Sequence, residues 1–274
     1  MPPVLRLLVL LVSCMACAAA GAAATPSQCL IEPSQKLEMR SPVSGRIIAI
    51  HVERGSIVRK GQVLVTLDSD VEQATLATAS YRSVMEGQIR AAQSRLSNAT
   101  QKLKRRDELQ KENFISAQDR DDTAADMRVA EADLLEARDT RELAKLEARR
   151  LTAVVSRYSL VSPIAGVVTD RLQNPGELAQ TSETNNANTS AIVKLAQIDP
   201  LRVDVVLPVA RYGVVKVGAV VDIKPEPPFT GVYKATVRVV DSIVDAASGT
   251  FRVRLDLPNP KGEITAGVKC TAGF

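Results

Sequence analysis

The chain has 274 residues, which indicates more than one domain, and its 45% hydrophobic and 24% charged residues exclude wholesale disorder and a polytopic membrane protein. Its 35 basic and 31 acidic residues leave a net charge of +4, too small an excess to indicate a polyanion-binding protein. Aromatic residues make up only 3%, without any Trp, so clustered rings for base stacking are lacking and no nucleic-acid partner is expected.

Residues 1–24 are predicted to be a secretory signal peptide. Arg6 gives a short positively charged start, residues 7–12 are an unbroken apolar run, and residues 18–24 are all small, as a cleavage site requires. The strongly apolar run is too short for a transmembrane helix, which needs about 20 such residues. The sequence therefore predicts an exported protein.

Cys14 offers a second way to process the N-terminus. It ends the sequence Leu11-Val12-Ser13-Cys14, which is similar to a bacterial lipobox, in which the cysteine becomes the lipidated first residue of the protein. Cleavage after residue 24 and lipidation at Cys14 stay open as alternatives.

Two cysteines, Cys29 and Cys270, remain if cleavage follows residue 24. An oxidising compartment favours a disulfide between them, but their spacing does not show whether they meet, so two separate thiols are an equal alternative. The remaining sequence has a single histidine, His51, and no C-x-x-C motif. Neither a metal site nor a cofactor is expected.

Residues 38–68 and 156–198 are predicted to be two copies of one β-strand pattern. The first copy has SPVSG at 41–45, a turn glycine at Gly55 and the apolar strand VLVTL at 63–67. The second has SPIAG at 162–166, a turn glycine at Gly176 and the strand AIVKL at 191–195, after a polar loop at 180–190. Such a repeat is typical of two halves of one small sandwich divided by an insertion.

The insertion, residues 69–155, is predicted to be a long helical hairpin. From 70 to 154 there is no proline and one glycine, Gly87, although both residue types are frequent in the rest of the chain. Two helices of about 43 residues, each about 65 Å long, would fold back antiparallel. Apolar or small residues recur in alternating steps of three and four, the spacing of a coiled-coil seam, and only Arg141 interrupts the series: Met85, Ile89, Ala92, Leu96, Ala99 and Leu103, then Met127, Ala130, Leu134, Ala137, Ala144, Ala148, Leu151 and Val155.

Two helix starts are marked by capping residues. Ser69 and Glu72 have the spacing of a capping box at the start of the first arm. Residues 111–119 interrupt the seam, and Ser116 followed by Asp119 predicts the N-cap of the second arm.

Residues 199–274 are predicted to form a small antiparallel β-barrel. Segments 233–239 and 251–257 alternate strictly between apolar and polar residues, segment 201–207 does so in part, and the strand at 219–223 follows Gly218.

The turn Gly55-x-x-Val58-x-x-Gly61-x-x-Leu64 is similar to the core of biotinyl and lipoyl domains. Such a domain cut by a coiled-coil hairpin resembles the periplasmic adaptors, or membrane fusion proteins of the HlyD/RND type, of tripartite efflux pumps. The resemblance begins near residue 37. It implies an elongated α+β fold with a split lipoyl/biotinyl-like β-sandwich interrupted by a long antiparallel α-helical coiled-coil hairpin, plus a small antiparallel β-barrel.

The predicted hairpin tip extends this resemblance. Adaptors that dock onto TolC-like outer-membrane channels carry an Arg, a Leu and a Ser in the register of Arg105, Leu109 and Ser116. The resemblance therefore implies a channel-docking patch made of these three residues. The alternative from the residues alone is that Arg105 is a solvated charge, Leu109 a seam residue and Ser116 a helix cap.

The resemblance also implies partners and a location. Several copies, six by analogy, would link an inner-membrane transporter, of RND type, to the channel in the periplasm of a Gram-negative bacterium, with or without a lipid anchor. It places the N-terminal segment 25–37 in the barrel beside the last strand, which makes Cys29 and Cys270 neighbours. Since no membrane-proximal domain is recognised after the barrel, an ABC-type exporter is the alternative transporter.

The sequence lacks the residues that two other classes of function require. A lipoyl or biotinyl carrier needs a lysine at the turn between its halves, and Asp68-Ser69-Asp70 stands there instead. A hydrolase or transferase needs a nucleophile with a base, or paired carboxylates in a pocket, and the sequence offers neither triad nor phosphate loop. The chain is therefore expected not to be an enzyme.

Overall fold

The computed structural model describes residues 27–181 and 191–274. The predicted signal peptide with Cys14, and most of the predicted 180–190 loop, lie outside the described residues. The described chain divides into two compact units, one made by residues 27–37, 164–167 and 195–274 and the other by residues 38–163, 168–181 and 191–194. Within these ranges no helix has both the length and the apolar character that a membrane span requires.

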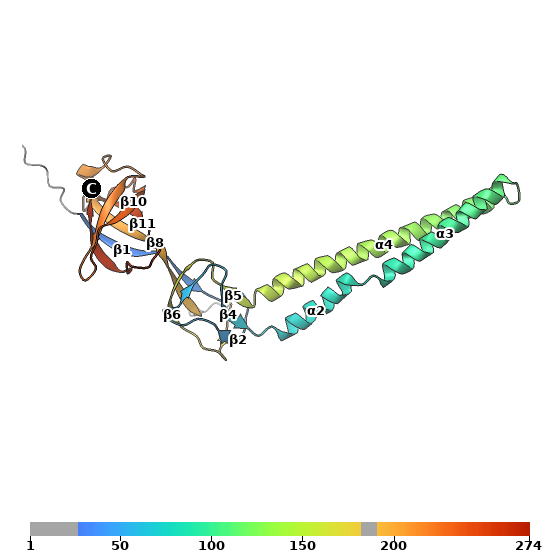
Figure 1. The fold of residues 1–274 in the computed structure, drawn as a ribbon, viewed down its shortest axis with the longest axis horizontal. Helices are drawn as coiled ribbons and strands as arrows, with labels where there is room; N and C mark the ends of the chain where they lie inside the picture. The colour runs from blue at the N-terminus through green and yellow to red at the C-terminus, as the bar shows by residue number, and fades with distance from the viewer. Residues whose placement is uncertain (1–26, 182–190) are drawn as a thin grey trace, which may run out of the picture. The chain divides into compact units, whose positions relative to one another are not determined.

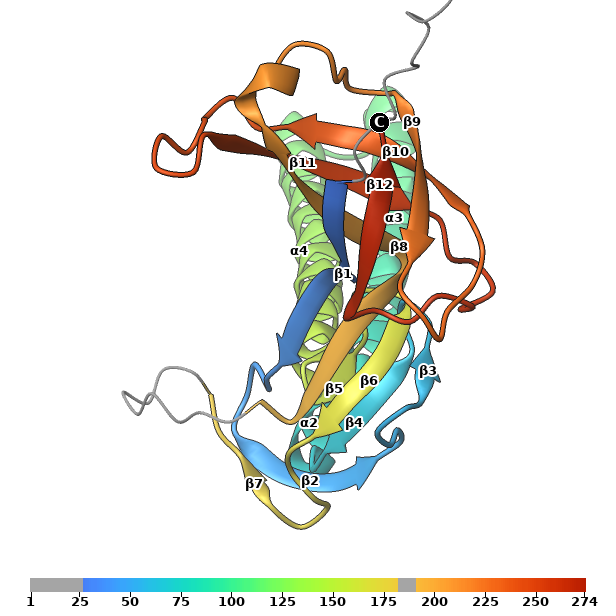
Figure 2. The ribbon, with the colours of Figure 1, turned by 90° about the vertical axis from the view of Figure 1, so that its left-hand side faces the viewer.

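The first unit is a closed six-stranded β-barrel. Hydrogen-bonded neighbours follow one another as β1, β12, β9, β10, β11 and β8, and β1 also pairs with β8, which closes the sheet (Figure 2). The strands are β1 (Ser27–Met39), β8 (Val193–Pro208), β9 (Val220–Pro225), β10 (Tyr233–Val240), β11 (Thr250–Leu257) and β12 (Val268–Gly273). The short 3-10 helix η1 (Val209–Arg211) follows β8.

The barrel interior is built by alternate residues of each strand. In β8, Leu201, Val203, Val205 and Leu207 are fully buried, and in β11 the large ring of Phe251 is 2% exposed. Because successive side chains of a strand point to opposite faces, the alternating segments of the sequence supply one apolar face each. The predicted antiparallel barrel is confirmed.

The second unit contains the split sandwich. One sheet has the order β5-β4-β2-β7, while β3 pairs with β6, which pairs in turn with β8. The strands are β2 (Gly45–Ile50), β3 (Ile57–Val58), β4 (Val63–Leu67), β5 (Ser159–Val161), β6 (Gly166–Arg171) and β7 (Leu178–Ala179).

The two halves of the sandwich hold each other through reciprocal hydrogen bonds. The Gly55 amide donates to the Val168 carbonyl at 2.8 Å, and the Gly176 amide donates to the Ile47 carbonyl at the same distance. Ile47 and Val168 occupy equivalent positions in the repeat, as do the two glycines, whose φ angles of 88° and 93° are in the left-handed region. The sequence repeat therefore corresponds to pseudo-twofold symmetry in space.

The helical hairpin also lies in the second unit. The second arm is one helix, α4 (Ala117–Ser156), as expected. The first arm was expected to be continuous, which is wrong: it consists of α2 (Asp70–Val84) and α3 (Gly87–Lys111), separated at Met85, whose ψ of 129° is extended (Figure 1). Gly87, the single glycine of the hairpin, adjoins the break and has a low helix propensity.

The predicted seam lines the contact between the arms. Ala92, Ala130 and Leu134 are buried, and the other predicted positions are half-buried except Met85, which is 53% exposed because it falls in the break. The small side chains let the helices approach closely. The coiled-coil hairpin is thus confirmed, with one interruption.

The start of the first arm is not the capping box that the sequence indicates. The Ser69 side chain makes no cap hydrogen bond to the helix backbone and instead accepts a hydrogen bond from Gln73 Nε2 at 2.8 Å. Glu72 Oε1 accepts a 2.8 Å hydrogen bond from the Tyr158 hydroxyl, just beyond the end of α4. The Glu72 carboxylate, which the local pattern predicted to cap the helix, is therefore bound by a residue far away in the sequence.

Candidate docking site at the hairpin tip

The tip of the hairpin is a tightly hydrogen-bonded turn between α3 and α4. Asn113 has a left-handed φ of 61°, unique among the non-glycine residues in the described ranges. Its amide donates to the Gln110 carbonyl, and the Phe114 amide donates to the Leu109 carbonyl, both at 2.9 Å. This pair of bonds is a Schellman motif, which satisfies the last carbonyls of a helix and reverses the chain.

The other side of the turn is a capping box at the start of α4. Ser116 Oγ accepts from the Asp119 amide at 3.1 Å, while the Ser116 amide and hydroxyl donate to Asp119 Oδ2 at 3.3 and 2.7 Å. These bonds, from the hydroxyl first and then from the amide, hold the pKa of Asp119 below its usual value. The predicted N-cap at Ser116 is confirmed.

The structure brings the three predicted docking residues to the same end of the hairpin. Arg105 and Leu109 are four residues apart on α3 and therefore share a helix face. Leu109 is 39% exposed and Ser116 is also exposed. Leu109, whose carbonyl accepts the Schellman hydrogen bond, and Ser116, the N-cap of α4, stand at the two ends of the turn. The length of the turn therefore explains why these residues are seven positions apart.

Arg105 and Leu109 point away from the contact between the arms. Residues 103, 106, 107 and 110 of α3 are half-buried toward α4, whereas Arg105 is exposed. Arg105 makes no ion pair within the part of the chain that the structure describes. Leu109 is more exposed than every predicted seam residue except Met85, which falls in the break of the first arm, so its role as a seam residue is not favoured.

Ion pairs join the arms below the tip. Arg120 Nε of α4 lies 2.8 Å from Asp107 Oδ1 of α3, and this hydrogen bond is the main cause of the raised pKa of Arg120. Lys102 pairs with Asp126 at 3.2 Å and Arg95 approaches Asp133 to 3.8 Å. Each of these exposed pairs is screened by solvent and contributes little to stability, but together they oppose other registers of α3 against α4.

Two tip residues were missed by the reasoning from sequence. Phe114 is 72% exposed, and Asn113 provides the left-handed residue on which the turn depends. The available signal was an Asn followed by two apolar residues, Phe114 and Ile115, directly after a polar helix end. Asn tolerates this conformation better than other residues with a side chain.

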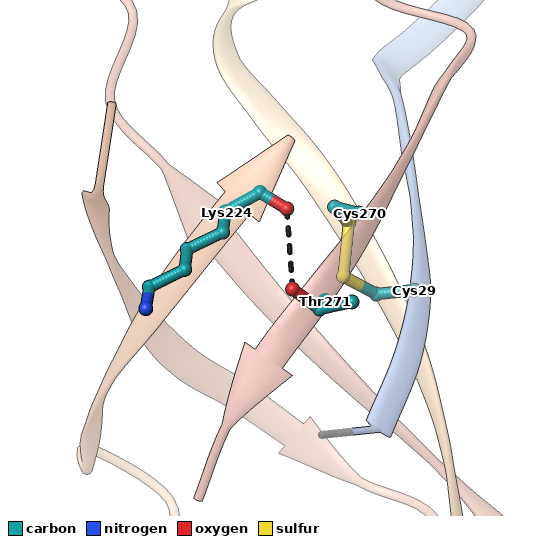
Figure 3. The surroundings of a disulfide bond; sticks show 4 residues. All are labelled: Cys29, Lys224, Cys270 and Thr271. Atoms are coloured by element: carbon teal, nitrogen blue, oxygen red, sulfur yellow. Dashed lines mark hydrogen bonds between the residues drawn. A yellow bond between two sulfur atoms is a disulfide. The ribbon is translucent and has the colours of Figure 1, made fainter. Parts of the chain in front are cut away.

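The other predicted site residues lie in the two β domains. In the barrel, Cys29 of β1 is directly opposite Cys270 of β12, and a disulfide with an S–S distance of 2.10 Å joins them (Figure 3). Both cysteines are buried. In the sandwich, His51 Nε2 is hydrogen-bonded to Thr66 Oγ1 at 2.9 Å. No cluster of three metal-ligating side chains occurs in residues 27–181 and 191–274.

The sequence matches two protein families, one in the hairpin and one in the barrel. Residues 81–149 match the family described as RND MFP, alpha-helical hairpin domain. Residues 201–274 match the CusB-like beta-barrel domain.

Curated relatives are similar over most of the chain. The multidrug resistance protein MdtE of Escherichia coli K12 is 26% identical over 256 residues, which are 88% of this chain and 61% of that protein. The multidrug export protein AcrE of the same strain is 26% identical, with 84% of this chain and 58% of that protein covered. MdtA of Photorhabdus laumondii is 29% identical, with 65% and 40% covered. The chain thus spans about two-fifths to three-fifths of these relatives.

Solved structures share the fold. MacA from Actinobacillus actinomycetemcomitans aligns with a TM-score of 0.72 at 21% identity, with 90% of this chain and 76% of that chain covered. The membrane fusion protein Spr0693 from Streptococcus pneumoniae R6 aligns with a TM-score of 0.60 at 17% identity, with 90% and 97% covered. The hairpin and the barrel of this chain thus each match a domain of RND-type membrane fusion proteins, and the fold is shared with solved structures of such proteins.

Proposed function

We propose that the chain is a periplasmic adaptor that links an inner-membrane transporter of the RND type to a TolC-like outer-membrane channel in a tripartite efflux system. The observation that carries this proposal is the tip, where Arg105 and Leu109 are exposed on one face beside Ser116. The names of the relatives, multidrug resistance protein and multidrug export protein, support efflux as the process.

A mechanical function fits the composition of the hairpin. Its arms pack through small and apolar residues, and its charged residues pair between the arms or lie on the outside. The exposed Leu109 and the guanidinium of Arg105 give the tip the apolar and cationic groups that a protein partner can bind. The tip offers a surface for contact and no catalytic machinery, so we propose a non-enzymatic role that needs no cofactor.

The proposal includes self-association and attachment. Several copies, six by analogy with the family, surround the axis between transporter and channel.

The N-terminus is processed in one of two ways, by lipidation at Cys14 or by cleavage after residue 24. Metabolic labelling with palmitate separates them: a labelled protein whose label is lost in Cys14→Ser is lipidated, and an unlabelled protein is released by cleavage.

Site-specific crosslinking in the cell envelope tests the docking patch. A photoreactive residue replaces Leu109, and the matched control is Leu135 of α4, an exposed leucine at 59% that lies away from the tip. We expect position 109 to capture an outer-membrane channel, identified by mass spectrometry, and position 135 to capture none. If positions 109 and 135 give the same products, the docking role of the tip is wrong.

Loss of efflux provides a second measurement. Leu109→Asp places a charge in the proposed contact, whereas Leu135→Asp changes an exposed leucine outside it. We expect only the first variant to raise drug accumulation, at equal protein levels. Equal accumulation in both variants would contradict the proposal.

A further inference from the structure

Phe114 is an exposed aromatic residue in a chain that has few aromatic residues. It is 72% exposed, whereas the other three phenylalanines are buried or half-buried. It lies in the turn between α3 and α4. An exposed apolar side chain indicates an interaction site when it belongs to a patch and not when it stands alone. The residues next to Phe114 therefore need to be considered.

The Schellman motif fixes the position of Phe114 beside Leu109. The Phe114 amide donates to the Leu109 carbonyl at 2.9 Å, and the Asn113 amide donates to Gln110 at 2.9 Å. In this motif the residues in the positions of Leu109 and Phe114 commonly make an apolar contact. We call these two residues the apical pair.

Contact within the chain does not account for the apical pair. Phe114 keeps 72% and Leu109 keeps 39% of its surface in solvent, whereas Ile115, the next apolar residue, is half-buried. The turn therefore directs Ile115 inward and leaves Phe114 outward. A residue needed only to stabilise the turn would be buried against it.

The surroundings of the apical pair resemble the centre of a protein interface. Arg105, Lys111 and Glu112 are exposed around it, so an apolar centre has a charged rim. Residues that dominate binding energy are commonly aromatic, lie at the centre of the contact and are shielded by a polar rim. A turn held by hydrogen bonds also reduces the entropy lost when Phe114 binds.

We infer that Phe114 is a further docking residue, which inserts with Leu109 into an apolar hollow at the periplasmic end of the outer-membrane channel. This inference rests on the proposed function, since it assigns the partner of the apical pair to the same channel. It adds a residue outside the Arg105, Leu109 and Ser116 pattern.

Crosslinking from position 114 tests the inference. The probe is p-benzoylphenylalanine, which retains the aromatic ring of Phe114. The matched control is the same probe at Tyr81 of α2, which is aromatic and 69% exposed. We expect the adduct of position 114 to contain the outer-membrane channel and the adduct of position 81 to lack it.

Substitutions separate docking from folding. We expect Phe114→Ser to reduce the channel adduct formed from position 109 about tenfold, a loss typical of a central interface residue. Phe114→Leu should restore most of the yield, and Tyr81→Ser should leave it unchanged. The unfolding midpoint of Phe114→Ser should equal that of the unsubstituted chain, because a residue important only for the turn would lower it.

The outcomes distinguish this inference from the proposed function. If position 109 captures the channel and position 114 captures nothing or another copy of this chain, the inference is wrong and the proposed function stands. If neither position captures the channel, the proposed function is wrong and the inference falls with it. A Phe114→Ser variant with full adduct yield also overturns the inference.

Discussion

Arg141 of α4 extends toward Glu86, with its Nη1 3.7 Å from Glu86 Oε1, at the point where the first arm of the hairpin is not helical. Arg141 is the one residue that interrupts the apolar series of the second arm. Glu86 also accepts from Arg90 at 2.7 Å, and this bond is the main cause of the lowered pKa of Glu86. Arg141, which interrupts the apolar series of the second arm, therefore faces the break between α2 and α3 in the first arm.

The packing around this ion pair is open. A cavity of about 230 Å³ lies between the arms there, and its walls include Met85, Ile89, Ala137 and Ala144. Because the first arm leaves its helical path, a small seam residue on α4 would have no partner to pack against. A long charged side chain reaches across to the carboxylate instead.

Arg141→Ala is expected to loosen the break without unfolding the hairpin. The side chains of Arg141 and Glu86 are 34% and 50% exposed, so solvent screens their pair and its loss should change the free energy of unfolding little. Amide hydrogen exchange of residues 85–90 should become faster, while exchange at the tip stays unchanged. As a control, Leu134→Ala removes a buried seam residue and should cost about 2–5 kcal/mol. An equal global loss in both variants would contradict this assignment.

Glycine-to-alanine substitutions are expected to have unequal effects on stability at equivalent positions of the repeat. A Cβ at Gly166 would lie 2.2 Å from the Ala196 carbonyl oxygen, so Gly166→Ala should destabilise the protein by about 1–3 kcal/mol. A Cβ at the equivalent Gly45 would meet Leu67 at 3.7 Å, an ordinary contact. Gly45→Ala should therefore be nearly neutral in chemical denaturation, and equal losses at both sites would be the contrary result.

Loss of the disulfide is expected to destabilise the barrel. Cys29 and Cys270 are 241 residues apart, so their bond restricts a large part of the unfolded chain, and its loss should cost about 2–5 kcal/mol. The measurement is the denaturation midpoint of the barrel for Cys29→Ala/Cys270→Ala compared with the unsubstituted chain. Reductant should lower the midpoint of the unsubstituted protein and leave that of the double variant unchanged. A reductant effect on the double variant would point to another cause.

The tip is expected to loosen in acid. The pKa of Asp119 is held below its usual 3.8 by Ser116, so the ionised carboxylate stabilises the folded turn. This contribution is present above the unfolded pKa and is lost as the pH falls through the lower, folded pKa. A carboxyl NMR titration should show Asp119 with a pKa below 3.8. Once Asp119 is protonated, the amides of the first turn of α4 should lose protection against exchange, measured relative to the rate of an unstructured amide at the same pH. In Asp119→Ala the pH dependence of this protection should disappear.

Local patterns in the sequence predicted those elements whose hydrogen bonds are local. The Ser116 cap depends on Asp119, three residues away, and was predicted correctly. The seam and the alternation of the barrel strands also follow from helix and strand periodicity, and the repeat revealed the two halves of the sandwich. At the tip, the spacing of Arg105, Leu109 and Ser116 was visible in the sequence.

Other features depended on partners distant in the chain. Glu72 has the spacing of a capping residue, yet it binds Tyr158, which only the folded hairpin brings near. The break at Met85 contains no proline, and its relation to Arg141 requires both arms. Asn113 takes a left-handed conformation that few sequence signals specify, and this conformation is what exposes Phe114.

The sequence by itself determined the kind of each element, because backbone periodicity, capping and turn chemistry act over a few residues. The tertiary structure decided which distant groups meet: Cys29 with Cys270, Gly55 with Val168, and Glu86 with Arg141. The spacing of these residues along the chain does not predict these contacts, since they depend on how whole strands and helices pack. The proposed docking patch shows both influences: the sequence sets the spacing of its residues, and the helix and the turn of the folded hairpin leave them exposed at the same end.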